Sequence, residues 1–321
     1  MRIGLDVMGG DYAPKATVMG AILAINELSA DEQIFLIGNK NEILSILEEE
    51  NVSPEKFKIV HTSETIEMNE HPTKAFTQKP DSSIVIGFDM LKKKQIDSFA
   101  SAGNTGAMLV GSIYCINAIE GIIRPCTSVS LPKENGSVGV MLDVGTNPDA
   151  RPDVMYQFGI LGSIYAEYVL NIKNPKVGLL NIGTEEEKGN ILTQSTFKLM
   201  KDNKDFNFIG NIESRDLIKD KADVIVCDGF TGNIVLKQME SFYRIFKKRN
   251  FHDDYLEKFN YENIGGTPIL GINSTVLIGH GISSPLAIKN MILQSRDISK
   301  AKLSGKIKKA LRKFTQNTVQ S

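Results

Sequence analysis

The alternation of short apolar runs with amphipathic helical stretches constrains the fold more than any other feature of the sequence. Runs typical of buried β-strands recur along the chain, at residues 3–8, 34–37, 58–60, 98–102, 138–143, 176–182, 206–209, 224–227 and 275–278. Helical periodicity fills many of the gaps, at residues 17–28, 42–49, 83–93, 156–170, 191–201 and 234–246. Near-continuous apolar strands that alternate with helices indicate an α/β fold, with a mostly parallel sheet and helices on both faces.

The chain shows no sign of a division into separate domains. No Pro-, Ser- or Gly-rich linker interrupts its 321 residues, so we expect a single compact unit over 1–321, with two lobes that share one sheet. The composition shifts only at the C-terminal tail, residues 300–321, where the stretch 300–314 holds seven Lys or Arg and no acid. The apolar residues of this tail recur at helical spacing, which predicts a basic helix.

Composition excludes several functional classes. The formal net charge is −1, so no global basic field attracts nucleic acid. The three cysteines form no CxxC pair and no cluster of metal ligands, which is typical of a protein from the reducing cytoplasm. The longest apolar stretch, residues 107–119, is too short to span a bilayer. We therefore expect a cytoplasmic protein.

Glycine and small polar residues follow six of the apolar runs. These turns lie at residues 9–14, 101–106, 143–147, 181–190, 227–233 and 279–283. The carboxyl ends of parallel strands meet at one edge of a sheet, where ligands bind in a crevice. Glycine lets backbone N–H groups approach a ligand, and a helix that starts after such a turn favours an anion. The turns therefore predict a site for phosphate or another oxyanion.

Several familiar motifs are missing from the sequence. There is no GxxxxGK[ST] of a P-loop NTPase, no GxGxxG after a strand, no HExxH and no GxSxG. No clear nucleophile stands near the predicted site, since Cys227 is better interpreted as a small buried residue at a strand end. We expect neither a metal nor a cofactor.

A set of segments carries a resemblance to a known family. In chain order they are DVMGGDYAP (6–14), IEMNEHPTKAFTQKPDSS (66–83), SAGNTGAM (101–108), LDVGTNPDARP (142–152), NIGTEEEKGN (181–190), FIGNIESRDL (208–217), VCDGFTGNIVLK (226–237) and YENIGGTPILG (261–271). With them the chain resembles the bacterial acyl-carrier-protein:phosphate acyltransferases of phospholipid synthesis. The resemblance implies a two-lobed fold like that of the isocitrate and isopropylmalate dehydrogenases. It also implies a homodimer that transfers a long acyl chain from acyl carrier protein to inorganic phosphate without nicotinamide or metal.

Three places depart from the family pattern. The segment between Lys237 and Tyr261 is shorter than usual, and in relatives it carries a helical hairpin linked to the dimer and to membrane contact. Thr146 and Ser214 stand where relatives usually have Ala and Gly. The family also implies a downstream partner, a membrane glycerol-3-phosphate acyltransferase.

The predicted site residues fall into three groups. The phosphate clamp comprises Gly103, Asn104, Thr105, Gly106, Thr231 and Asn233. The catalytic candidates are Lys188, His280, Asp228 and Asn181. The crevice is expected to be lined by Gly9, Gly10, Asp11, Asp143, Gly183 and Ser283. Because phosphate already has a nucleophilic oxygen, these groups need mainly to hold it and to stabilise the oxyanion that forms on the thioester carbonyl.

Structural interpretations of these residues stay open beside the functional ones. Lys188 is also consistent with a solvated side chain of the acidic run 185–187, and His280 with a hydrogen-bonded turn residue. Asp228 is equally suited to cap the helix that follows it. Asp6 and Asp143 are also consistent with buried structural acids, paired across the crevice.

Three other activities also remain open. One is a phosphotransacetylase that uses acyl-coenzyme A, and another is a dehydrogenase of the same fold. The third is a scaffold that binds acyl carrier protein without turnover.

Two basic stretches could dock an acidic carrier protein. They are residues 244–249, which lie among aromatic side chains, and the tail at 300–314. Aromatic and basic residues together are also typical of a helix at a membrane interface. We expect weak, salt-sensitive contact with the inner face of the membrane through residues 242–251.

Overall fold

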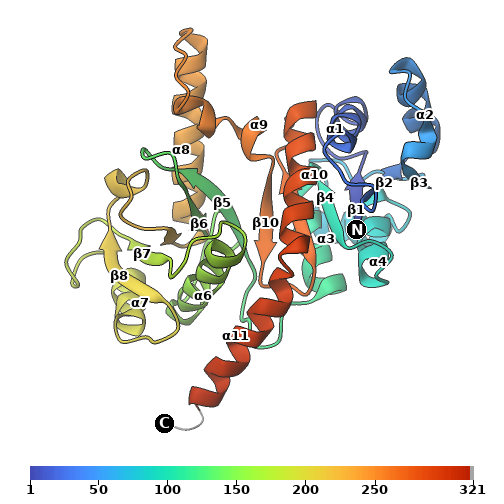
Figure 1. Cartoon of the computed structure of the whole chain (residues 1–321). Helices are drawn as coiled ribbons and strands as arrows, with labels where there is room; N and C mark the ends of the chain where they lie inside the picture. The colour runs from blue at the N-terminus through green and yellow to red at the C-terminus, as the bar shows by residue number, and fades with distance from the viewer. Residues whose placement is uncertain (319–321) are drawn as a thin grey trace. The chain divides into compact units, whose positions relative to one another are not determined.

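The computed structural model describes the backbone of residues 1–318 and the side chains up to residue 311. The chain folds into two compact units. Unit 1 comprises residues 1–117, 261–268 and 272–300, and unit 2 comprises residues 118–260, 269–271 and the C-terminal segment from 301. Figure 1 shows the helices and strands of both units, most of them labelled.

Unit 1 is built on a largely parallel sheet with the strand order β3-β2-β1-β4-β11-β10. Its strands are β1 (Arg2–Asp6), β2 (Gln33–Gly38), β3 (Lys58–His61), β4 (Ser98–Ser101), β11 (Thr275–Gly279) and the first part of β10 (Gly266–Leu270). Only β10 runs antiparallel to its neighbour β11. The carboxyl ends of β1, β4 and β11 therefore lie at the same edge of this sheet, where three of the predicted turns follow.

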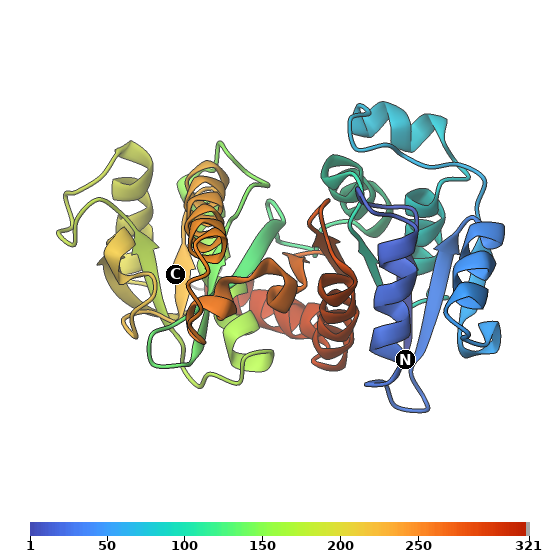
Figure 2. The same cartoon turned by 90° about the horizontal axis from the view of Figure 1, so that it is seen from above.

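The helices of unit 1 connect and cover these strands. They are α1 (Lys15–Ile25), α2 (Lys40–Glu49), α3 (Pro72–Gln78), α4 (Ser83–Lys92), α5 (Thr105–Gly111), α9 (Tyr261–Ile264) and α10 (Pro285–Lys300), with a short π-helix at Ser112–Ile116. Helices α1 and α10 lie side by side (Figures 1 and 2), and Gly20 of α1 packs directly on Ile288 of α10. Helix α4 packs on β4 where Gly87 leaves room for the ring of Phe99.

Unit 2 contains a second stretch of sheet with the order β10-β5-β6-β9-β7-β8. Its strands are β5 (Cys126–Pro132), β6 (Val138–Leu142), β7 (Lys176–Leu180), β8 (Asn207–Ile212) and β9 (Val224–Val226), with the last residues of β10 at its edge. Strand β5 is antiparallel to both β10 and β6, whereas β6, β9, β7 and β8 are parallel. The carboxyl ends of the parallel strands again share one edge.

The helices of unit 2 are α6 (Pro152–Tyr168), α7 (Ile191–Lys201), α8 (Gly229–Lys248) and α11 (Leu303–Thr318). Helix α6 packs on β6 and β9, and Gly162 of α6 lies against Val224 of β9. Helix α11 packs on α6, with the Lys306 ammonium 3.6 Å from the centre of the Tyr168 ring. Such a cation–π contact adds to the apolar packing of the helix.

Polar side chains cap the first turns of several helices. A side-chain oxygen accepts a backbone N–H of the first turn in α2, α4, α5, α7 and α8, from Asn39, Ser82, Asn104, Asn190 and Asp228. These caps satisfy donors that a helix cannot pair internally. Asn104 and Asp228 lie three and two residues after the ends of β4 and β9, so α5 and α8 begin inside two of the predicted turns.

The predicted α/β class with a mostly parallel sheet is confirmed. Sequence periodicity missed β5 and β10, because buried serines such as Ser128 interrupt the apolar run of β5 and because Pro268 is unfavourable in a strand. The basic tail is helical as α11, although residues 319–321 lie outside the described part of the chain. The interpretation of residues 1–321 as one acyltransferase unit stays a prediction.

Candidate active site

In unit 1, the turns after β1 and β4 pack backbone against backbone. A side chain at Gly9 would overlap the Asp6 carboxylate and would place its Cβ 2.6 Å from the backbone nitrogen of Gly103. Gly10 has a φ of +112°, which side-chain-bearing residues rarely adopt. These glycines are needed for the close approach of the two turns and for their shape.

Asp6, the last residue of β1, organises this pair of turns. Its fully buried carboxylate accepts the Ser101 hydroxyl at 2.6 Å and the Met8 backbone N–H at 3.0 Å. The Ser101 oxygen in turn accepts the Gly103 N–H at 2.9 Å. Burial raises the pKa of Asp6 above its ordinary value, and these hydrogen bonds oppose that rise.

The small residues of the β4–α5 corner face other parts of unit 1. The Asn104 side chain is 4% exposed, caps Ala107 through its oxygen at 3.0 Å, and donates to three carbonyls of residues 67–70. A Cβ at Gly106 would overlap the ring of Pro72. Thr105, by contrast, is exposed. The phosphate roles of these residues stay predictions, with the Asn104 amide already engaged.

The turn after β11, which holds the predicted residues His280 and Ser283, lies next to the β1 turn. The backbone N–H of Asp11 donates to the Gly281 carbonyl at 2.7 Å. The buried Ser283 hydroxyl donates to the His280 carbonyl at 2.6 Å, which fixes the turn. The His280 ring is exposed and lies 5.7 Å from that of Tyr261, so its nitrogens remain available for a ligand or a proton.

In unit 2, Asp143 organises the turn after β6. One carboxylate oxygen accepts the N–H of Thr127 at 3.0 Å, its hydroxyl at 2.9 Å and the Thr146 N–H at 3.3 Å. The other accepts the backbone and side-chain N–H groups of Asn147 at 2.6 and 2.9 Å. Donors of its own unit thus surround the fully buried Asp143, and its pairing with Asp6 stays a prediction.

Helix α8 begins against this turn. Glycine at position 229 allows the helix to approach the turn, because a Cβ there would lie 2.8 Å from the Asp143 carboxylate. Asp228 caps the helix by accepting the Thr231 N–H at 2.9 Å and its hydroxyl at 2.7 Å. The Asn233 amide lies beside Gly145, and it makes no hydrogen bond within the described chain. Asn233 is therefore free to donate to a ligand, whereas the Thr231 hydroxyl already donates to Asp228.

Lys188 lies in the loop between β7 and α7. The Asn181 amide shapes this loop by donating to the Lys188 carbonyl at 3.0 Å. The Lys188 side chain is exposed and makes no ion pair in the described chain, although acids precede it. Among these acids, Glu186 pairs instead with Lys201. Gly183 lies against the aliphatic part of Lys188, and the ammonium group remains uncommitted.

The remaining chemistry near the unit 2 turn is limited. Cys227 is buried, and its thiol contacts the Asp143 carbonyl at 3.4 Å. Burial, with the nearby charges of Asp228 and Asp143, raises the pKa of this thiol well above its ordinary value. Among the residues that the structure describes, no group of three or more His, Cys, Asp and Glu side chains could hold a metal ion, and no helix is long and apolar enough to cross a membrane.

Sequence reasoning overlooked two features of these turns. The loop 65–71, most of which belongs to the segment 66–83 that carries the family resemblance, reaches the β4–α5 corner. In unit 2, the large apolar side chains Ile182 and Ile191 are 79% and 85% exposed on either side of the Lys188 loop. Only an apolar residue inside a polar turn pointed to the second feature, and no local pattern pointed to the first.

Comparison with known proteins places the chain in a family. A family model described as fatty acid synthesis protein matches residues 1–306. The phosphate acyltransferase of Dictyoglomus turgidum is 41% identical over 335 residues, covering 98% of this chain and 99% of that protein. The phosphate acyltransferase of Thermoanaerobacterium thermosaccharolyticum is 43% identical over 317 residues, covering 93% of each.

A likeness to solved structures supports the fold. A phosphotransacetylase from Streptococcus pyogenes matches with a TM-score of 0.66 over 93% of this chain and 94% of that one, at 16% identity. At this identity the match shows the fold alone. The near-complete coverage by relatives above 40% identity decides the family: the chain belongs to the fatty acid synthesis protein family and is an enzyme of its phosphate acyltransferase group.

Proposed function

We propose that the chain transfers a long-chain fatty acyl group from acyl carrier protein to inorganic phosphate and so forms acyl phosphate for phospholipid synthesis. The observation that carries this proposal is the 41% identity to a phosphate acyltransferase over 98% of the chain. The uncommitted ammonium of Lys188 and amide of Asn233, both in unit 2, support phosphate as the acceptor. Both groups can donate hydrogen bonds and have no partner in the described structure, so both are available to bind an oxyanion.

The reaction needs no covalent enzyme intermediate. An oxygen of hydrogen phosphate attacks the thioester carbonyl carbon, the C–O bond forms and the C–S bond breaks. The sulfur leaves with the bonding electrons, and the proton of the hydrogen phosphate ends on the thiol. Lys188 and Asn233 hold the phosphate, while the α8 N-terminus favours its charge. The catalytic role of His280, which is exposed beside Tyr261 in unit 1, stays a prediction.

The test uses the purified chain with palmitoyl-acyl carrier protein and phosphate. We expect phosphate-dependent release of free thiol and trapping of an acyl phosphate by hydroxylamine. Equal thiol release without phosphate would show a thioesterase and overturn the proposal. Palmitoyl-coenzyme A and acetyl-coenzyme A are run in parallel, and a preference for the acetyl donor would instead identify a phosphotransacetylase.

Two other classes are separated by simple measurements. A dehydrogenase would change ultraviolet absorbance when NAD and a 2-hydroxy acid are added, and we expect no change. A scaffold would bind acyl carrier protein without releasing thiol. Both outcomes are distinct from the phosphate-dependent turnover expected here.

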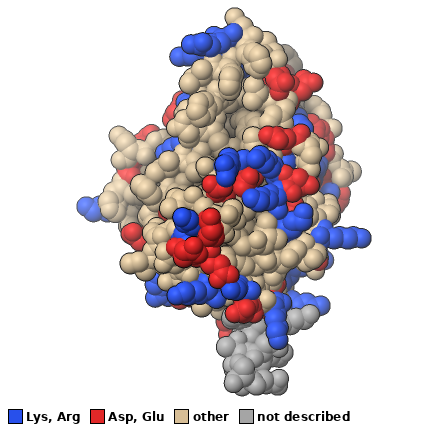
Figure 3. All heavy atoms as spheres, turned by 90° about the vertical axis from the view of Figure 1, so that its left-hand side faces the viewer, with Lys and Arg blue, Asp and Glu red and all other residues tan. Residues whose placement is uncertain are grey.

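We also propose that the end of α8 makes weak contact with the inner face of the membrane. Phe242 and Phe251 are 52% and 57% exposed beside four basic residues, Arg244, Lys247, Lys248 and Arg249. Figure 3 shows Lys and Arg side chains at the projecting end of α8, while Lys, Arg, Asp and Glu mix over the rest of this face. Aromatic side chains with cations suit anionic lipid. An acidic carrier protein would suit the same cations.

Sedimentation with anionic liposomes at low and high salt tests this contact. We expect binding that falls with salt and is lost when Lys247→Glu and Lys248→Glu are combined. Binding that ignores lipid charge would contradict it, and loss of carrier-protein turnover alone would reassign the cations to docking. The homodimer and the downstream membrane glycerol-3-phosphate acyltransferase, both implied by the family, stay predictions.

A further inference from the structure

The loop between β3 and α3 is tied to the β4–α5 corner by one side chain. We call residues 65–71 the strap. The Asn104 amide nitrogen donates to the carbonyls of Glu67 and Glu70 at 3.0 Å each and to that of Met68 at 3.3 Å. Because Asn104 is buried, these bonds are shielded from water, and its oxygen simultaneously caps α5.

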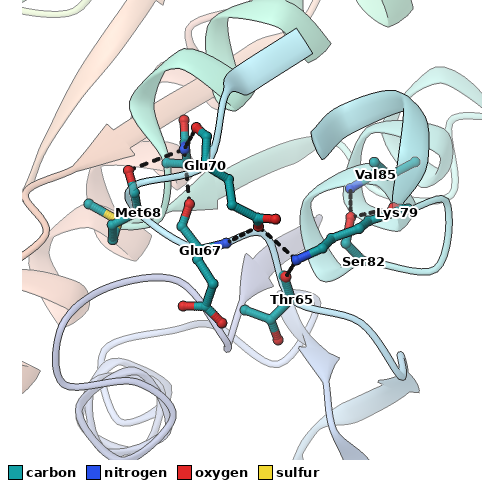
Figure 4. A network of polar contacts seen from close by, with 8 residues as sticks. Thr65, Glu67, Met68, Glu70, Lys79, Ser82 and Val85 are labelled. Atoms are coloured by element: carbon teal, nitrogen blue, oxygen red, sulfur yellow. Dashed lines mark hydrogen bonds and ion pairs between the residues drawn. The ribbon is translucent and has the colours of Figure 1, made fainter. Parts of the chain in front are cut away.

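A second set of contacts fixes the strap from its other side. The Glu70 carboxylate accepts the Lys79 ammonium and the Glu67 backbone N–H, each at 2.7 Å (Figure 4). Lys79 also donates to the Thr65 carbonyl at 2.7 Å. The strap is therefore held in one conformation by internal bonds and by Asn104, although most of its side chains are exposed.

The strap presents one exposed apolar side chain. Met68 is 44% exposed, and its terminal methyl lies against Gly281, where an added Cβ would be only 2.9 Å from it. The Asp11 carboxylate borders the same glycine, and a Cβ there would lie 3.5 Å from its nearest oxygen. Met68 thus stands next to the predicted turns after β1 and β11.

We propose that Asn104 is a positioning residue rather than a phosphate ligand, and that it holds Met68 as an apolar contact for the acyl donor. A methionine side chain is flexible and polarizable, so it suits an alkyl chain or a pantetheine arm. Fixing its backbone lowers the entropy lost when the donor binds. This inference rests on the proposed acyl transfer, and it assigns to the donor a corner that the sequence pattern assigned to phosphate.

The first test separates the two substrates kinetically. Asn104→Ala should raise KM for palmitoyl-acyl carrier protein about tenfold while KM for phosphate stays unchanged. A raised KM for phosphate with an unchanged donor KM would overturn the inference. Asn104→Asp keeps the oxygen that caps Ala107 but loses the donors to the strap, so it should behave like Asn104→Ala. Normal kinetics in Asn104→Asp would reduce Asn104 to a helix cap and would also overturn it.

The second test concerns Met68 itself. Met68→Ala should raise the donor KM by a similar factor, and Met68→Leu should restore it, because it retains the apolar volume. In the double variant with Asn104→Ala the two effects should not add, since both remove one contact. Additive effects would show that Asn104 acts elsewhere.

A binding measurement keeps the inference testable even without turnover. Palmitoyl-coenzyme A should slow the oxidation of Met68 by hydrogen peroxide in the wild-type chain by about tenfold, because a covered thioether is inaccessible. In Asn104→Ala this protection should be lost. An unchanged oxidation rate on adding the ligand would overturn the inference. Absence of phosphate-dependent turnover with intact protection would instead reject only the proposed function.

Discussion

The turns after β1 and β6 are each organised by a fully buried aspartate, but they differ in which hydrogen-bond donors nearby remain without a partner. Asp143 is surrounded by five hydrogen bonds from Thr127, Thr146 and Asn147, whereas Asp6 receives the Ser101 hydroxyl and the Met8 N–H at short range. In unit 1, the Asn104 amide already donates its hydrogen bonds to the strap. In unit 2, amide and ammonium donors stay uncommitted. A glycine-rich turn therefore marks a sheet edge without telling which of its polar groups can meet a ligand.

The largest effect on turnover should come from the free donors of unit 2. Lys188→Ala and Asn233→Ala should each lower kcat/KM by about 10²–10³, because each removes a bond to the bound phosphate or to the oxyanion that forms during attack. Steady-state kinetics with varied phosphate measures this. Neither side chain has a hydrogen bond or ion pair in the described structure, so thermal unfolding should be unchanged.

A matched control sharpens the comparison between donors. Lys201→Ala removes another lysine of the same region, which pairs with Glu186. It should leave turnover near the wild-type value, because an exposed ion pair contributes little. Equal losses in Lys188→Ala and Lys201→Ala would mean that the general charge of the region matters and not the Lys188 ammonium.

The second prediction compares the two buried acids directly. Asp143→Asn should lower the free energy of unfolding by about 3 kcal/mol. The amide NH₂ group of the asparagine would then face N–H and O–H groups that donate hydrogen bonds to the carboxylate in the wild type. Asp6→Asn should cost about 1 kcal/mol, since the Ser101 hydroxyl can reverse its role and accept. Urea unfolding at neutral pH measures both. Equal losses of unfolding free energy in the two variants would show that the two aspartates stabilise their turns to the same extent.

The pH dependence of stability should change in Asp6→Asn. Burial raises the folded-state pKa of Asp6 above the ordinary 3.8, so its ionised form is disfavoured in the folded protein. Its contribution to stability is therefore fully present below 3.8 and is lost as the pH rises through the raised folded value. Asp6→Asn should remove this decline from a series of urea unfolding curves. A decline that persists unchanged would assign it to other groups.

Part of this organisation could be predicted from the sequence, for a physical reason. Periodicity reports burial, so the parallel strands and the turns at their ends were predicted, as was the capping interpretation of Asp228. Availability of a donor depends on partners distant in sequence, and no local pattern reports them. Asn104 contacts residues more than thirty positions away, and Glu186 pairs with Lys201, fifteen positions further along the chain, rather than with the nearby Lys188.

The smallest effect should follow removal of the thiol beside Asp143. Cys227 is buried against Gly232, whose added Cβ would lie 2.9 Å from the sulfur, so the site has no room for an acyl group. Burial holds the pKa of the thiol well above its ordinary value, which suppresses the thiolate that a covalent route requires. Cys227→Ala should therefore keep turnover within about twofold of wild type, while lowering the free energy of unfolding by about 1 kcal/mol through the small cavity left behind. Cys126→Ala is the control, since Cys126 is equally buried and its thiol pKa is raised in the same way. Abolished turnover in a folded Cys227→Ala variant, with Cys126→Ala active, would restore the covalent route. It would also make the turn beside Asp143 a nucleophile site rather than the support of an oxyanion clamp.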